Sequence, residues 1–164
     1  MNELQRLLIG DAAAAAPGQI VAGVAEEMAH RKPEGVSRSL YEELWHVVFW
    51  TELSLDWIGG VATPYPASAV DGFPTALEME RESWAELTVR FQRGLERAVL
   101  AAGDAGLLET RVACPSMPGA ASRWMTVREQ LENMGAHNAY HLGRMVLMRQ
   151  MMGAWPPKGG GFTW

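Results

Sequence analysis

Two histidines four residues apart, His137 and His141, are the residues of this chain whose types and spacing point most clearly to chemistry. In an α-helix, side chains at this spacing lie on the same face, one turn apart. Two such imidazoles can bind one metal ion, because a neutral ring nitrogen suits zinc, nickel or iron. Asn138 stands where the His-Glu-x-x-His motif of metalloproteases has its glutamate. The spacing therefore indicates a metal site without indicating peptide cleavage.

A third histidine, His46, lies in a strongly apolar helical segment and could complete a three-histidine site. The alternative is a core histidine bonded to its neighbours, which is the commoner fate of a lone histidine on a buried helical face. Glu43 lies one turn before His46, where it could orient an imidazole or activate a water molecule, as a catalytic residue would. A glutamate in the first turn of a helix is explained equally well by the helix dipole.

The sequence offers no convincing fourth ligand. His30 lies at the end of the first helical segment, and Cys114 lies in a segment that we expect to be a proline-flanked loop. A structural zinc usually has four protein ligands, whereas catalytic sites keep a position open. Three histidines therefore favour an enzyme, and a noncatalytic metal-binding or interaction module remains the alternative.

Composition predicts one domain spanning residues 1–164, with 48% apolar and 20% charged residues. The net charge of −5 gives no attraction to nucleic acid or to an anionic membrane. No apolar stretch reaches the length of about 20 residues that crosses a bilayer, and residues 12–16 only superficially resemble part of a leader. The single cysteine excludes an internal disulfide and is compatible with a reducing compartment. We therefore expect a cytoplasmic protein that acts on a small molecule.

The elements that must position the histidines follow from helical periodicity, and no convincing alternating strand appears. Gly10 and Pro17-Gly18 should break the helical segment over residues 3–29 into two pieces. Ser37 or Ser39, with Glu42 or Glu43, should cap the segment over residues 37–58, and Gly59-Gly60 should end it. Irregular connections, among them residues 103–123, and a nonhelical tail from residue 153 complete the chain. The predicted fold is an all-α four-helix bundle with long connections, whose helical segments span residues 3–29, 37–58, 76–102 and 126–152.

Seven tryptophans and ten methionines are many for a chain of this length. Several tryptophans lie within predicted helices, so most should pack in the core or in an interface; alternatively, some line a substrate pocket near the metal. Surplus apolar surface on a small bundle favours a homodimer, and a monomer with internal aromatic residues is the alternative.

The chain resembles the DinB/YfiT-like superfamily of metal-dependent enzymes. The resemblance rests on Leu44-Trp45-His46, on His137-x-x-x-His141, on Tyr140-His141-Leu142-Gly143 and on the Trp155-Pro156-Pro157 tail. It implies an up-down-down-up four-helix bundle that holds a divalent metal, zinc or nickel, through His46, His137 and His141. Characterised relatives include bacillithiol-dependent thiol transferases and mycothiol-dependent maleylpyruvate isomerases. The resemblance thus implies a hydrolase or a transferase with a low-molecular-weight thiol cosubstrate, although Arg144 replaces a glutamine that relatives often have.

Overall fold

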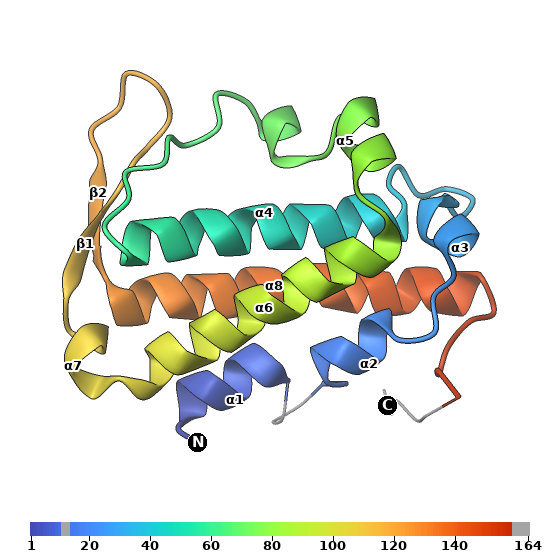
Figure 1. The fold of residues 1–164 in the computed structure, drawn as a ribbon, viewed down its shortest axis with the longest axis horizontal. Helices are drawn as coiled ribbons and strands as arrows, with labels where there is room; N and C mark the ends of the chain where they lie inside the picture. Colours follow the sequence, from blue (N-terminus) through green and yellow to red (C-terminus); the bar gives the residue numbers. More distant parts are fainter. Residues whose placement is uncertain (11–13, 159–164) are drawn as a thin grey trace.

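The computed structural model describes residues 1–10 and 14–158, and three long helices dominate it (Figure 1). They are α4 (Leu40–Ile58), α6 (Trp84–Gly103) and α8 (Val127–Met151). Shorter helices α1 (Glu3–Ile9), α2 (Pro17–Val21) and α3 (Glu26–His30) precede them, and α1 and α2 lie against α6 and α8 in the place of a first bundle helix. The expected all-α fold is confirmed.

The directions of the helices follow from contacts between them. The Tyr41 hydroxyl donates to the Glu82 carbonyl near the starts of α4 and α6, and Arg90 pairs with Glu52 farther along, so α4 and α6 are parallel. Gln130 near the start of α8 bonds to Ser54 near the end of α4, so these two are antiparallel.

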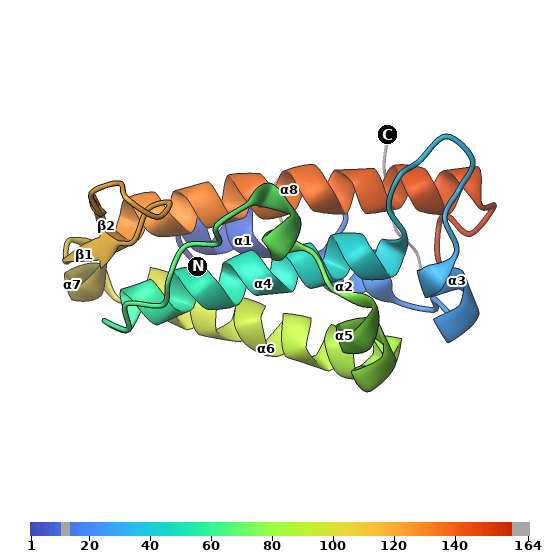
Figure 2. The ribbon, with the colours of Figure 1, turned by 90° about the horizontal axis from the view of Figure 1, so that it is seen from above.

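Helix α1 is antiparallel to α6, because Asn2 donates to the Ala102 carbonyl and Gln5 donates to the Val99 carbonyl. The order is therefore up-down-down-up, as the resemblance implied, and Figure 2 shows α4 and α8 side by side.

Side-chain caps begin the two helices that carry the histidines. Ser39 accepts from the Glu42 backbone N–H, while the Glu42 carboxylate accepts from the Ser39 N–H, a capping box that starts α4 as expected. Thr126 and Glu129 form the same motif at the start of α8. Gly59 ends α4, as the sequence predicted. These two helices are thus bounded by local signals as well as by packing.

The segment over residues 3–29 forms three helices, α1, α2 and α3, and not the two pieces that we expected. Gly10, at φ 74°, ends α1 in a left-handed conformation that favours glycine. Pro17 begins α2 as its first residue, where its missing N–H costs nothing. The predicted helix over residues 76–102 is also divided, into α5 (Ala76–Arg81) and α6, because Ser83 caps a new helix.

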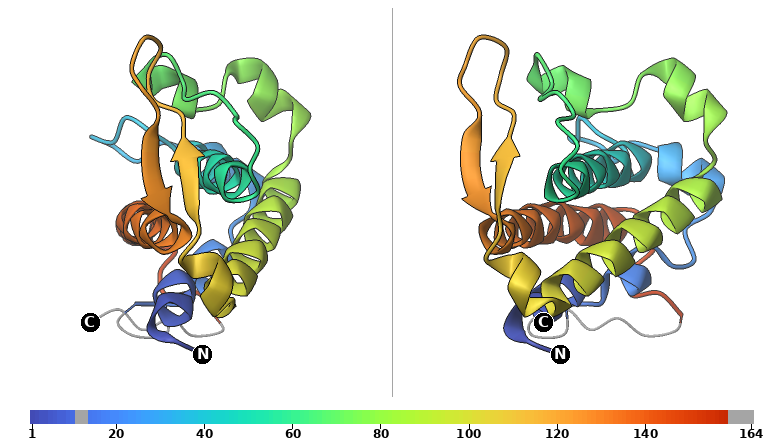
Figure 3. Two further views of the ribbon diagram at one scale, coloured as in Figure 1. Left: turned by 90° about the vertical axis from the view of Figure 1, so that its left-hand side faces the viewer. Right: turned by 60° about the vertical axis from the view of Figure 1, so that its left-hand side comes forward.

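The expectation that the chain has no strands, with an irregular segment over residues 103–123, is wrong. That segment contains α7 (Ala105–Leu108) and β1 (Arg111–Cys114), and β1 pairs antiparallel with β2 (Arg123–Thr126). The hairpin stands at the end of the bundle where α4 ends and α8 begins (Figure 3). Cys114 is therefore a buried strand residue and not part of a loop.

The tryptophans Trp45, Trp57 and Trp84 are buried in the core.

The long connection between α4 and α5, residues 59–75, crosses over α4 and is called the crossover connection below. It includes the short 3-10 helix η1 (Ala69–Gly72). After α8, residues 153–158 are nonhelical, and the rest of the predicted tail lies outside the described residues, as does part of the alanine run at residues 12–16. In the described part of the chain, no helix is long and apolar enough to span a bilayer.

Candidate metal centre

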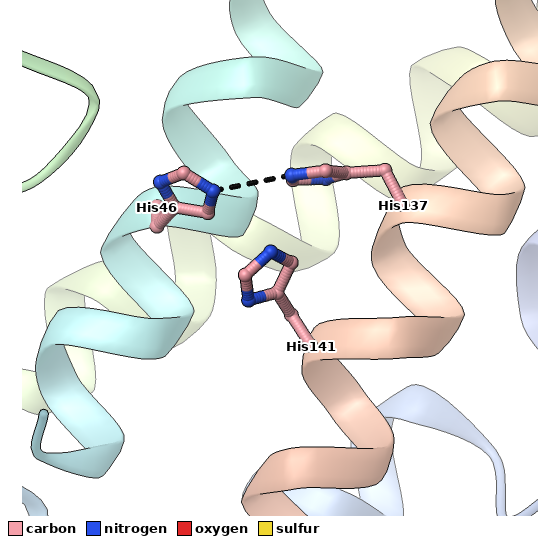
Figure 4. A group of neighbouring side chains, drawn as sticks. All are labelled: His46, His137 and His141. Carbon is pink, nitrogen blue, oxygen red and sulfur yellow. Dashed lines mark hydrogen bonds between the residues drawn. The ribbon is translucent and has the colours of Figure 1, made fainter. Parts of the chain in front are cut away.

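The three histidines singled out from the sequence converge between α4 and α8 (Figure 4). His46 comes from α4, and His137 and His141 come from successive turns of the antiparallel α8. One ring nitrogen of each lies within 4.8 Å of one ring nitrogen of the others, and the Nε2 atoms of His46 and His137 are 3.1 Å apart. Residues 91 positions apart in sequence thus form one cluster of nitrogen donors.

The crossover connection fixes the ring of His46. Its Nδ1 atom lies 2.7 Å from the carbonyl oxygen of Gly72 in η1, and Phe73 stacks on the ring at 4.2 Å between centroids. A carbonyl oxygen only accepts hydrogen bonds, so Nδ1 of His46 carries the proton. The Nε2 atom is left with its lone pair directed at the other histidines.

Glu43 fixes His141 in the same way. Its Oε2 atom accepts from Nδ1 of His141 at 2.7 Å, and its Oε1 atom pairs with the Arg144 guanidinium at 2.8 Å. Burial alone would raise the pKa of the Glu43 carboxyl, but the His141 bond and the Arg144 charge outweigh it and hold that pKa below its ordinary value. Glu43 is therefore an ionised acceptor for the Nδ1–H of His141, which leaves Nε2 as the ring nitrogen that faces the other two histidines (Figure 4).

His137 is held more loosely. Its Nδ1 atom lies 3.4 Å from Oδ1 of Asn138, whose amide nitrogen donates to Thr51 of α4 at 3.3 Å. Burial lowers the pKa of His137, and burial lowers the pKa of His46 to about 4. Both rings are therefore neutral at neutral pH, the state in which imidazole binds a metal.

The donor set fits a divalent cation. Three neutral imidazoles that carry their protons on Nδ1 would bring three Nε2 lone pairs together, which repel one another unless a positive charge lies between them. Carbonyl, amide and carboxylate oxygens behind the rings are the partners that metal-binding histidines usually have. Zinc and nickel both suit such a set of nitrogens.

The other two candidate ligands lie elsewhere. His30 stacks on Tyr41 and bonds to Glu26 on its own short helix. Cys114 is buried in β1, where its thiol lies 3.6 Å from Gln130, and burial raises the pKa of that thiol. Neither belongs to the cluster that the described residues form.

Sequence reasoning missed the contributions of Gly72, which contacts His46, and of Arg144, which contacts Glu43 next to His141. Gly72 acts through its backbone carbonyl, which no side-chain pattern reveals. Arg144 had appeared only as a departure from related sequences, although its position three residues after His141 places it beside that histidine on the helix.

A cavity of about 430 Å³ opens beside the cluster. His46 and His137 lie at one side of it, and its remaining lining comes from α4, α8, the crossover connection and β2: Trp50, Ser54, Trp57, Tyr65, Arg123, Gln130, Asn133 and Met134. Its volume lies within the range of about 300–1,000 Å³ that is typical of small-molecule sites.

Comparison with curated proteins gave no match. Comparison with protein families matched residues 12–145 to the DinB superfamily. The match extends from before α2 to Met145 in α8 and includes all three histidines of the cluster. With its helical bundle and this match over most of its length, the chain belongs to the DinB superfamily.

Proposed function

We propose that the protein binds one divalent metal ion, zinc or nickel, through the Nε2 atoms of His46, His137 and His141, and that it is a metal-dependent enzyme. The observation that carries the proposal is the orientation of the rings. The Nδ1 atoms of His46 and His141 face oxygen acceptors at 2.7 Å, so their Nε2 lone pairs face the interior of the cluster. A histidine that only fills a core needs no such convergence.

A divalent cation held by three neutral histidines supplies Lewis acidity, which favours the deprotonated form of a bound water or thiol. The residues of the chain prepare the site for this. Glu43 keeps the proton of His141 on Nδ1 and sets the ring orientation, so we assign it as a positioning residue. The adjoining cavity offers room for a small-molecule substrate.

The reaction class that we propose is hydrolysis or the transfer of a group to a low-molecular-weight thiol. Three protein ligands and a cavity that His46 and His137 line support an enzyme over a noncatalytic metal-binding module. A structural site would be expected to have a fourth ligand and no adjoining space.

The test is a colorimetric screen of the zinc- and nickel-loaded protein with activated esters and with thiol–electrophile pairs. We expect turnover that chelation abolishes and that added zinc or nickel restores. The matched control is the His137→Ala/His141→Ala variant, which should be inactive under all conditions. Turnover that persists after chelation and in the double variant would contradict the proposal.

A further inference from the structure

The cavity beside the histidines is a trough with a direction. On α4 its lining residues Trp50, Ser54 and Trp57 continue the face that carries His46, at intervals of three or four residues. On α8 the lining extends from His137 back to Gln130, a separation of about 10 Å at 1.5 Å per residue. The trough thus begins at the histidine cluster and runs toward the β-hairpin.

One wall of the trough is aromatic. Tyr65, from the crossover connection, lies 5.2 Å from Trp50 and 6.4 Å from Trp57, measured between ring centroids. The Trp57 ring N–H donates to the Thr63 carbonyl at 2.8 Å, so it needs no partner in the trough. This wall offers apolar surface, mainly from the half-buried Trp50 and Tyr65, which favours an aromatic or otherwise apolar body.

In the middle of the trough, the buried polar side chains of Ser54 and Gln130 are already paired. Gln130 donates to the Ser54 hydroxyl at 2.8 Å, and the Cys114 thiol lies 3.6 Å from its amide oxygen. Two of the groups that could bind polar atoms of a ligand in the middle of the trough therefore already have partners.

The far end carries a single unmatched charge. Arg123 of β2 lines the trough, and none of the described lining residues is acidic. Within residues 1–10 and 14–158, its guanidinium makes no ion pair and no hydrogen bond, whereas Arg128 pairs with Glu109 and Arg111 donates to the Trp124 carbonyl. A guanidinium at the end of a trough with an aromatic wall suits a carboxylate, which it can bind through two parallel hydrogen bonds.

We propose that the trough binds a small apolar carboxylate, whose carboxylate pairs with Arg123 and whose body lies against Trp50, Trp57 and Tyr65. The opposite end of such a molecule then faces the histidine cluster, because the lining on α8 extends over about 10 Å from Gln130 to His137. This inference rests on the proposed function and adds to it the substrate class: a carboxylic acid whose reacting group is remote from its carboxylate.

The test compares 3-phenylpropionate with its neutral amide, 3-phenylpropanamide, by calorimetry and by tryptophan fluorescence, in the protein as purified and after chelation. We expect the wild type to bind the carboxylate about threefold more tightly than the amide, because Arg123 is exposed and solvent screens its ion pair. Arg123→Gln should abolish that preference, while Arg93→Gln, which removes an exposed charge on α6, should keep it. Tyr65→Ala should weaken both probes equally and leave their ratio unchanged.

Equal binding of the two probes by the wild type, or a preference that survives in Arg123→Gln, would overturn the inference. So would acetate binding as tightly as 3-phenylpropionate, since acetate lacks the apolar body. The preference for the carboxylate is also measured after chelation, so the outcome of this test does not depend on a bound metal. If the protein contains its metal but shows no preference for the carboxylate, this inference is wrong and the proposed function stands. If the protein prefers the carboxylate but contains no metal, the proposed function alone is contradicted.

Discussion

Each histidine of the cluster is oriented by an oxygen atom that lies close to its Nδ1 atom. The sequence predicted the three histidines and allowed Glu43 to orient an imidazole, because spacing along a helix determines which side chains share a face. It could not predict Gly72, since a backbone carbonyl 26 residues from His46 has no side-chain signature. Glycine at that position has a physical reason: an added Cβ would lie 3.2 Å from Nε1 of Trp50 and 3.4 Å from Nδ1 of His46.

Replacing Glu43 tests the carboxylate behind His141. In Glu43→Gln the amide oxygen can still accept the bond, but the negative charge that favours a metal-bound imidazole is lost. We expect the affinity for zinc to fall about tenfold, at the lower end of the effect usual for such partners. Competition with a chromophoric chelator measures it.

Glu42→Gln is the matched control, because Glu42 is equally buried on the same turn but bonds to Ser39, Arg38 and Lys32 instead. It should lower the thermal midpoint and leave zinc affinity unchanged. Equal zinc affinities in Glu43→Gln and the wild type would show that Glu43 does not tune the site.

Among the elements, those with long periodic patterns and strong caps were predicted best. Helices α4 and α8 are where the sequence placed them, which is why the histidines meet as expected. The hairpin was missed because each strand has four residues, too few for alternation to stand out from chance. The break at Ser83 was missed because the apolar pattern of residues 76–102 obscured the capping box that starts α6.

Arg149 of α8 contacts the backbone of α2 near the start of the chain, and its replacement should lower the stability of the fold. This fully buried side chain donates to the carbonyls of Gln19, Ile20 and Ala154. Arg149→Met leaves these acceptors without their partner, so we expect the free energy of unfolding to fall by about 3 kcal/mol. Urea denaturation measures the change, with the exposed Arg93→Met as the control; equal stabilities of the two variants would contradict this role.

For the whole molecule, we expect the metal to serve chemistry and not to hold the fold. The two core clusters of the described residues consist of apolar side chains and do not depend on the histidines. Chelation leaves neutral imidazoles, which cost less to bury than unpaired charges. Chelated protein should keep its helical circular dichroism and melt cooperatively a few degrees lower. Loss of the helical signal on chelation at room temperature would instead indicate a structural metal.

We also expect a homodimer, though not through the tryptophan-rich faces that first suggested one, since Trp45, Trp57 and Trp84 lie in the core. Exposed Tyr140, Leu147 and Met151 follow one face of α8, and we expect this face to form the interface instead.

Leu147→Glu tests this interface, with Leu100→Glu on α6, also exposed, as the control. Light scattering should report a dimer for the wild type and for Leu100→Glu, and a monomer for Leu147→Glu. A monomeric wild type at high micromolar concentration would rule the interface out.

The measurement that tests the account most directly is the metal content of the purified protein and of its histidine variants. We expect close to one divalent ion per chain in the wild type and in His30→Ala, whose ring lies outside the cluster. We expect almost none in His46→Ala, in His137→Ala and in the double variant His137→Ala/His141→Ala, provided that circular dichroism shows each to be folded. Full occupancy in the folded double variant would contradict the three-histidine site.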